Sequence, residues 1–325
     1  MKILVAGGAG YIGSCTVEYL LDRGHDVVVY DSLVKGHRAA VDPRAKFILG
    51  DLADRAKIFQ AVAAEKPAGI IHFAAFIEVG ESMKDPGKYF INNDSCGLNL
   101  LDAAVAGGVR KIVFSSTAAT YGMPSVIPIP ETEKTEPINA YGESKLIFEK
   151  ILRWYREIHG LNYIALRYFN ACGATAKRGE DHNPESHLIP IILQVAQGKR
   201  PHIGIYGDDY PTADGTCIRD YIHVTDLAQA HLLALESPLS GSFNVGSGNG
   251  FSVKEIIEAA RQVTGHPIPA QVSPRRAGDP AFLISDSTAV RTQLGWKPQH
   301  DDIKKIIADA WNWRQRNPDG YAEKV

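Results

Sequence analysis

Tyr141 and Lys145, in Ala140-Tyr-Gly-Glu-Ser-Lys145, are residue types that could together move a proton. They stand four residues apart at the start of an expected helix, so their side chains share one face. A nearby ammonium stabilises a phenolate and lowers the pKa of tyrosine from its ordinary value of about 10. The pair therefore predicts general base catalysis on an alcohol or sugar hydroxyl.

A hydroxyl-rich segment, Phe114-Ser-Ser-Thr-Ala-Ala-Thr-Tyr-Gly122, supports this interpretation. The support is needed because the chain has 13 tyrosines, and one Tyr-x-x-x-Lys pair alone could be accidental. The segment follows an expected strand, where Thr117 could bond the reacting oxygen and share its proton with Tyr141. Single hydroxyls in loops are usually turn formers, and that interpretation is kept for Ser115, Ser116 and Thr120.

The run Gly7-Gly-Ala-Gly-Tyr-Ile-Gly13 follows an expected strand and opens an expected helix. Such glycines let the backbone approach a pyrophosphate, and the helix N-terminus offers N–H donors to the anion. A tight turn would explain the run equally well, but Asp31 ends a second strand about 20 residues downstream, where it can bind the adenosine ribose. The acid favours NAD over NADP because a 2′-phosphate would meet like charge, although Lys35 and Arg38 lie close in sequence.

Two further segments are candidate cofactor contacts. Asp51 and Leu52 follow the third expected strand and are candidates for the adenine, although an ordinary acidic loop is almost as good an interpretation. Phe73-Ala-Ala75 ends the fourth strand with small residues. Small residues there would let the cofactor cross the carboxyl edge, where open sheets bind ligands.

The first half of the chain alternates β-branched runs with helical patterns, which predicts a doubly wound, parallel Rossmann-type α/β sheet covered on both faces. The expected strands are Lys2–Ala6, Asp26–Tyr30, Lys46–Leu49, Gly69–Phe73, Lys111–Ser115 and Tyr163–Tyr168. The expected helices are Tyr11–Arg23, Asp54–Lys66, Tyr89–Ala106 and Ala140–His159.

After about Asn170 the pattern gives way to proline-containing polar loops. Helices are expected at Thr225–Glu236, Val253–Thr264 and near Asp302–Asn317. We expect a dinucleotide-binding domain over 1–169 that also includes about 220–240, and a smaller mixed α/β substrate domain over 170–325.

The 325-residue chain has a formal net charge of −2 and a pI near 6.6, with no charge block that favours nucleic acid or anionic lipid. Its apolar runs are shorter than the roughly 18 residues that a membrane-spanning helix needs. The four cysteines, Cys15, Cys96, Cys172 and Cys217, lack zinc-binding spacing and suggest buried thiols in a reducing cytosol. We expect a cytoplasmic protein with small-molecule partners and no metal.

Several later motifs are more specific than the glycine run: His72-Phe-Ala74, Val79-Gly-Glu-Ser82, Arg167-Tyr-Phe-Asn170, Tyr206-Gly-Asp-Asp-Tyr-Pro-Thr212, Asp214-Gly-Thr216, Arg219-Asp-Tyr-Ile-His-Val224 and Arg275-Arg-Ala-Gly-Asp279. With these motifs, essentially the whole chain resembles the extended short-chain dehydrogenase/reductases, and within them the enzymes that epimerise UDP-sugars at C4′. The resemblance implies a bound NAD and a UDP-sugar substrate.

Residue roles follow as expectations. NAD contacts are expected at Gly7, Gly10, Tyr11, Ile12, Gly13, Asp31, Ser32, Asp51, Leu52, Phe73, Ala74, Ala75, Asn92, Ser115, Tyr141, Lys145 and Phe169. By the resemblance, Thr117, Asn170, His187 and Leu188 would meet the sugar nucleotide, Gly204, Ile205 and Tyr206 the uracil, Arg219 and Arg276 the diphosphate, and Asp279 the uridine ribose. Arginine suits a diphosphate because its planar fork binds two phosphate oxygens.

The implied reaction interconverts UDP-glucose and UDP-galactose. Tyr141 would take the 4′-hydroxyl proton while hydride leaves C4′ for NAD, and the bound ketose would turn and recover the hydride on its other face. NAD is then regenerated, which makes the enzyme an isomerase.

Three alternatives stay open. Dehydratases of this fold carry an Asp-Glu pair after the threonine equivalent to Thr117, and Ala118 and Ala119 at those positions disfavour elimination. A non-catalytic NAD-binding sensor would typically lack the tyrosine or the lysine. The third alternative is a different UDP-sugar substrate, N-acetylated or pentose. It stays open because Leu283 stands at the position that, by the resemblance, limits N-acetyl substituents.

The chain departs from the family pattern at a few positions. Ser32 stands where asparagine is usual and Ile77 where some members carry lysine, and each removes a polar contact to the cofactor. Asp94 and Cys96 replace valine and glycine, which affects local helix packing. Family members pair the helices expected at Tyr89–Ala106 and Ala140–His159 into a four-helix seam. We therefore expect a homodimer, with an intrachain core as the alternative.

Overall fold

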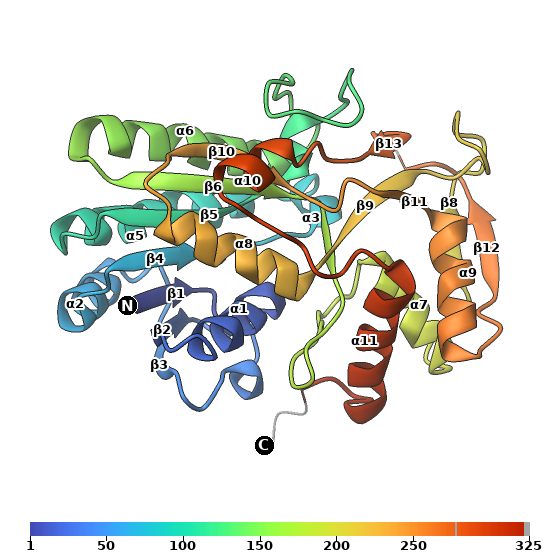
Figure 1. Cartoon of the computed structure of the whole chain (residues 1–325), viewed down its shortest axis with the longest axis horizontal. Helices are drawn as coiled ribbons and strands as arrows, with labels where there is room; N and C mark the ends of the chain where they lie inside the picture. Colours follow the sequence, from blue (N-terminus) through green and yellow to red (C-terminus); the bar gives the residue numbers. More distant parts are fainter. Residues whose placement is uncertain (277, 322–325) are drawn as a thin grey trace.

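A parallel sheet of seven strands lies at the centre of the larger lobe (Figure 1). The computed structural model describes residues 1–276 and 278–321. The sheet order is β10-β6-β5-β4-β1-β2-β3, and every neighbouring pair is parallel. Its strands are β1 (Lys2–Ala6), β2 (Asp26–Asp31), β3 (Lys46–Leu49), β4 (Gly69–His72), β5 (Lys111–Thr117), β6 (Asn162–Tyr168) and β10 (Gly241–Val245). The predicted doubly wound Rossmann-type sheet is confirmed.

Helices cover both faces of this sheet (Figure 1). They are α1 (Tyr11–Leu21) and α8 (Val224–Glu236) on one face, and α2 (Arg55–Glu65), α5 (Cys96–Ala106) and α6 (Ala140–His159) on the other. Successive residues of β1 alternate between the two cores, because side chains in a strand point to opposite faces. Ile3 and Val5 pack with α1 and α8, whereas Leu4 and Ala6 pack with α2 and α5.

The helix expected at Tyr89–Ala106 is not continuous. The chain forms α4 (Pro86–Tyr89), then a π-helical stretch η2 (Phe90–Ser95), and only then α5. The wider π turn brings Asn93 into contact with its neighbours: its Oδ1 accepts from the Phe76 amide at 2.9 Å, and its Nδ2 donates to the Ser144 hydroxyl at 3.0 Å. Such turns often occur at functional sites, and these bonds tie η2 to α6.

The smaller lobe contains elements that the sequence pattern only partly predicted. It holds the strands β7 (Asn170–Cys172), β8 (Ile203–Tyr206), β9 (Ile218–His223), β11 (Gly250–Ser252), β12 (Ala270–Ser273) and β13 (Phe282–Leu283), with the helices α7 (Leu188–Ala196), α9 (Val253–Thr264) and α11 (Ile303–Arg316). Helices α9 and α11 were expected; α7 and the strands were not. Shorter elements are η1 (Arg38–Ala40), α3 (Val79–Ser82), η3 (Ala118–Tyr121) and α10 (Thr288–Gln293). Among the described helices, none combines the length and apolarity needed to span a membrane.

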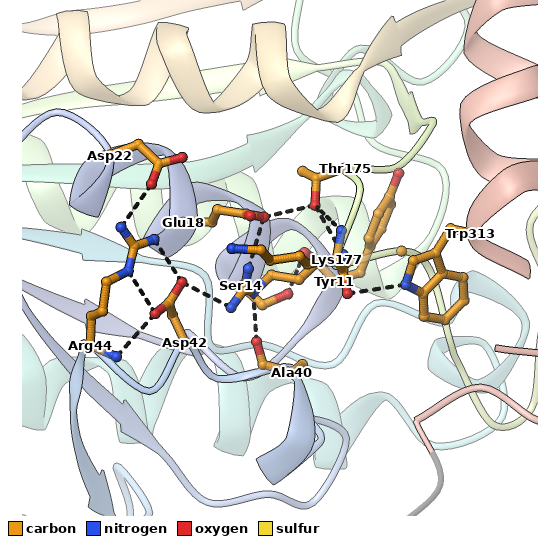
Figure 2. Close-up of polar contacts among 12 residues, drawn as sticks. Tyr11, Ser14, Glu18, Asp22, Ala40, Asp42, Arg44, Thr175, Lys177 and Trp313 are labelled. Carbon is orange, nitrogen blue, oxygen red and sulfur yellow. Dashed lines mark hydrogen bonds and ion pairs between the residues drawn. The ribbon is translucent and has the colours of Figure 1, made fainter. Parts of the chain in front are cut away.

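Buried ion pairs join the segment after β7 to the larger lobe (Figure 2). Arg178 pairs with Glu18 of α1 at 2.8 Å and with Asp42 at 3.1 Å, and it is almost fully buried. Thr175 also donates to Glu18, at 2.7 Å, and Arg44 donates to both carboxylate oxygens of Asp42. These contacts fix the segment that leads into α7 against the N-terminal helix.

The buried His231 of α8 gives a testable pH dependence. It lies against the Phe73 ring, with its Nδ1 2.8 Å from the Leu227 carbonyl, and burial lowers its pKa to about 4. Unfolded histidine has a pKa of about 6.5, so between these values only the unfolded state binds the proton. The wild type should therefore lose about 1.4 kcal/mol of unfolding free energy per pH unit relative to His231→Leu as pH falls through this window. Urea unfolding at about pH 7 and about pH 5 measures the difference, and an equal difference at both would contradict the prediction.

Candidate active site

The structure brings Tyr141, Lys145 and Thr117 together at the carboxyl end of β5. The first two lie in the opening turns of α6, which Asn139 caps by accepting from the Gly142 amide at 2.8 Å. Lys145 is only 2% exposed, and its Nζ lies 5.9 Å from the centre of the Tyr141 ring. Thr117 ends β5, and its side chain hydrogen-bonds to Tyr141.

Contrary to the expectation from the sequence, the protein's own residues do not lower the pKa of Tyr141. Burial raises the pKa of Tyr141 to about 12, and the Thr117 hydrogen bond offsets this only in part. Burial also lowers the pKa of Lys145 to about 7, against the opposing effect of the Asp94 carboxylate. Removal from water disfavours the charged form of both groups, and in each case burial is the largest effect. A phenolate at this site needs further positive charge.

Close backbone contacts explain the glycine turn between β1 and α1. Gly7 has φ +81°, and a Cβ there would lie 2.5 Å from the Ala74 amide nitrogen. A Cβ at Gly13 would overlap the Gly7 carbonyl, and Gly10 is the N-cap of α1. The first helical amides, including those of Tyr11 and Ile12, lack intrahelical acceptors by helix geometry. They form a site at which an anion would bind.

Asp31 lies beside this turn at the end of β2. It is buried, and its two carboxylate oxygens accept from the amides of Ala9 at 2.9 Å and Leu33 at 2.8 Å. Burial raises its pKa, with both backbone bonds opposing. The carboxylate is thus fixed at the sheet edge, and the predicted Ser32 follows it directly, half-buried.

The other predicted cofactor residues spread along the same edge. Asp51 is exposed and accepts from the Ala53 amide, whereas Leu52 is buried. Phe73, Ala74 and Ala75 follow β4, Ser115 lies near the end of β5 and Phe169 follows β6, whereas Asn92 lies in η2. The Asn92 side chain donates to Asn93, and it is Asn93 that accepts from the backbone amide of Phe76.

The predicted diphosphate residues lie on β9 and in the segment before β13. Arg219 Nη2 donates to Asp279 at 2.9 Å, and Arg219 is nearly buried. The Arg276 guanidinium lies 3.9 Å from the centre of the Tyr206 ring, at the end of β8. Each arginine expected at the diphosphate therefore has a predicted neighbour: Arg219 lies beside Asp279, expected at the ribose, and Arg276 lies beside Tyr206, expected at the uracil.

The remaining predicted substrate residues lie in the smaller lobe. Asn170 begins β7, and its Nδ2 donates to the Asp220 carbonyl at 2.9 Å. His187 is the N-cap of α7 and Leu188 is its first residue. Gly204 and Ile205 lie within β8, which pairs with β12 and not with the large sheet.

Two residues of the site were not predicted by sequence reasoning. Asn93 ties η2 to α6, and the adjacent asparagines were the available signal. Asp94 is buried, and burial raises its pKa to about 7 beside Lys145. The sequence marked Asp94 only as an unusual residue for helix packing. Its closeness to Lys145 depends on the π-helical turn.

A cavity of about 540 Å³ lies between α1, α8 and α11. Its lining includes Arg23, His223 and Asp309 but none of the predicted site residues. The candidate active site is therefore defined by the convergent side chains at the sheet edge and not by this cavity.

Comparisons with known proteins agree with this arrangement. The chain belongs to the NAD dependent epimerase/dehydratase family, whose model matches residues 3–246. A relative from Lacticaseibacillus casei, a UDP-glucose 4-epimerase, is 57% identical over 330 residues and covers 100% of both chains.

Solved structures show the same likeness. UDP-glucose 4-epimerase from Brucella ovis, in complex with NAD, has a TM-score of 0.92 at 46% identity and covers 95% of this chain and 97% of its own. The enzyme of that name from Bifidobacterium longum, in complex with NAD⁺ and UDP, has a TM-score of 0.93 at 38% identity, with coverage of 98% and 100%.

Proposed function

We propose that this protein interconverts UDP-glucose and UDP-galactose by epimerisation at C4′ with bound NAD. The observation that carries the proposal is the grouping of half-buried Tyr141 with buried Lys145 and Thr117 at the same sheet edge as the glycine turn. The names of relatives that align over the full chain support the same reaction.

The residues at the glycine turn fit NAD. The space that a Cβ would fill at Gly7 and Gly13 is taken by backbone, so the turn stays close enough to the α1 N-terminus to receive a pyrophosphate. Asp31 would accept from the adenosine ribose. Bound NAD would take the C4′ hydrogen as hydride and return it, and its cationic nicotinamide would favour the phenolate of Tyr141.

On the substrate side, we assign Arg219 and Arg276 to the diphosphate and Tyr206 to the uracil. Asp279 holds Arg219 in place and would turn to the uridine ribose. Asn170 at the start of β7, and His187 and Leu188 at the start of α7, would contact the sugar nucleotide. Anchoring at the diphosphate leaves the sugar free to rotate, which inversion at one carbon requires.

The proton steps follow from the geometry around Tyr141. Its phenolate oxygen would accept the 4′ proton, with Thr117 as the hydrogen-bond partner and Lys145 as the nearby cation. The reverse transfer on the other face of the turned ketose completes inversion. Ala118 and Ala119 follow Thr117 in η3, so neither position supplies an acid to expel a second hydroxyl. Elimination is thereby disfavoured against simple epimerisation.

We also propose a division of labour between the lobes, with residues 1–169 and about 220–240 holding NAD and the rest of 170–325 holding the UDP-sugar. Helix α8 packs on the large sheet beside α1. Strand β10 (Gly241–Val245), just past this range, pairs with β6 and extends the same sheet.

A homodimer is proposed from the outer face of α6 and η2. Trp154 is 56% exposed, Ile158 68% and Ile91 63%, which is a large apolar surface for a free helix face. A second copy would cover it. Sedimentation at micromolar concentration should show a dimer, and a monomer would contradict this assignment.

Cytoplasmic location is proposed from the four free cysteines.

Incubation of the purified protein with a panel of UDP-sugars tests the function. We expect UDP-galactose and UDP-glucose to interconvert to one equilibrium mixture from either side. Exclusive turnover of N-acetylated or pentose forms would instead assign a different substrate, and Leu283, which packs against the buried cluster around Ala118 and Phe169, would be the residue to vary. Retained NAD without turnover of any UDP-sugar would favour a sensor.

Gly13→Ala is expected to weaken NAD binding by about tenfold or more, because its new methyl group overlaps the Gly7 carbonyl and must push the turn away from the pyrophosphate. The nucleotide released on denaturation gives the NAD content per chain. Gly87→Ala is the matched control, since its Cβ meets only Asp85 at 3.8 Å. Equal NAD content in both variants would contradict the assignment of this turn.

A further inference from the structure

The segment between β7 and α7 gathers four metal-ligating side chains. They are Glu180, His182, Glu185 and His187, spaced Glu-x-His-x-x-Glu-x-His. One ligand atom from each lies within 4.8 Å of all the others. We infer that these four side chains form a zinc site, although the cysteine pattern had predicted no metal.

The separations fit one tetrahedral ion. Glu180 Oε1 lies 2.5 Å from Nδ1 of His187 and 3.3 Å from Nδ1 of His182. Glu185 Oε1 lies 3.6 Å and 3.9 Å from the same two nitrogens. Zinc bonds of about 2.0–2.1 Å place the ligands of a tetrahedron about 3.3 Å apart, within the range of these distances. Small side-chain movements would equalise them.

Charge and burial favour a dication at this point. The Glu180 and Glu185 side chains are 7% and 2% exposed. Within the part of the chain that the structure describes, the two imidazoles are their only cationic side-chain partners. Glu185 Oε2 and His182 Nδ1 are buried without a hydrogen-bond partner. Buried carboxylates need compensating charge, and zinc bound by neutral imidazoles supplies it.

The surroundings hold the ligands in place. Glu185 Oε1 accepts from the amides of Ser186 and His187, each at 2.9 Å. The Tyr11 ring meets His182 edge-on at 6.3 Å, and the Tyr11 hydroxyl donates to the Gly173 carbonyl. Contacts to metal ligands from groups that do not themselves bind the ion orient those ligands and strengthen metal binding.

The ligand set assigns the ion and its role. Two imidazoles and two carboxylates suit zinc, and four protein ligands leave no open position, as in structural sites. The ion would fix the start of α7 to the segment that contacts Tyr11 in the glycine turn. Binding through Nδ1 leaves the His187 Nε2 protonated and able to donate, and its side chain is 45% exposed toward solvent. The inference does not depend on which sugar is the substrate.

Metal analysis of the untagged full-length protein, grown with added zinc and gel-filtered, tests the inference. We expect about one zinc per chain in the wild type and a loss of more than about tenfold in Glu185→Gln and in His182→Gln. His300→Gln is the matched control, because His300 also pairs with a carboxylate, Asp226, but lies outside the cluster. Zinc at the same level in all variants, or none in the wild type, would overturn the inference.

A second measurement does not need the variants to fold. Wild-type protein treated with a chelator is titrated with Co²⁺, and the visible absorption of tetrahedral cobalt should saturate at about one equivalent and vanish on adding Zn²⁺. Absence of tetrahedral bands, or a linear rise without saturation, would overturn the site.

Discussion

Tyr141→Phe is expected to lower kcat for the interconversion of UDP-glucose and UDP-galactose by about 10²- to 10⁴-fold. The substitution removes only the hydroxyl that Thr117 contacts and leaves the ring packed 5.9 Å from the Lys145 ammonium. KM should change little because the proposed anchors of the nucleotide are elsewhere. Steady-state rates with UDP-galactose, measured with NAD content, separate a loss of chemistry from a loss of cofactor.

Tyr155→Phe is the matched control for this variant. Tyr155 lies on the same helix, and its hydroxyl donates to Asp102 at 2.6 Å, away from the candidate site. It should keep a kcat close to that of the wild type. If Tyr141→Phe turned over as fast as Tyr155→Phe, the assignment of Tyr141 as the base would be wrong.

Glu149→Ala is expected to reduce the free energy of unfolding by about 3–5 kcal/mol. Glu149 of α6 is buried and accepts from Arg167 at 2.9 Å and 2.6 Å, and from the Ser242 hydroxyl at 2.9 Å. Truncation leaves the Arg167 guanidinium buried without its charge partner, which costs more than the pair itself contributes. Urea unfolding monitored by circular dichroism measures the change.

An exposed acid on the same helix provides the comparison. Glu157→Ala should stay within about 0.5 kcal/mol of the wild type. The double variant Glu149→Leu, Arg167→Met removes both charges and should recover part of the loss. A Glu149→Ala protein as stable as Glu157→Ala would contradict the importance of the buried pair.

The large sheet could be predicted from the sequence because its signals are local. Lys2–Ala6 and Lys46–Leu49 have the predicted bounds, and the other predicted strands differ by a few residues. Near-continuous apolar runs alternating with helical periodicity allow few other folds. The smaller lobe lacks this redundancy: β8 and β12 pair across more than 60 residues of chain, and neither run is long enough to be recognised alone.

The sequence was a better guide to which residues lie at the candidate site than to the pKa values of those residues. Spacing alone put Tyr141 and Lys145 on one face of α6, and the glycine run marked the turn that packs on Ala74. Spacing could not give the pKa of Tyr141, because burial depends on every element that covers the site. Asp94 approaches Lys145 only through the π-helical turn, which no periodicity predicted.

Local sequence patterns were enough to predict the class of sheet, the glycine turn, the position of Asp31 at the end of β2 and the tyrosine–lysine pair, since each depends on contacts within a short stretch of chain. Tertiary structure alone decided how Arg219 meets Asp279, and how Arg178 fixes the segment after β7 against α1. It also decided that Glu180, His182, Glu185 and His187 converge, with the two glutamates buried. Charge, burial and distance between remote residues are properties of the packed chain, and they set the chemistry that local patterns only suggest.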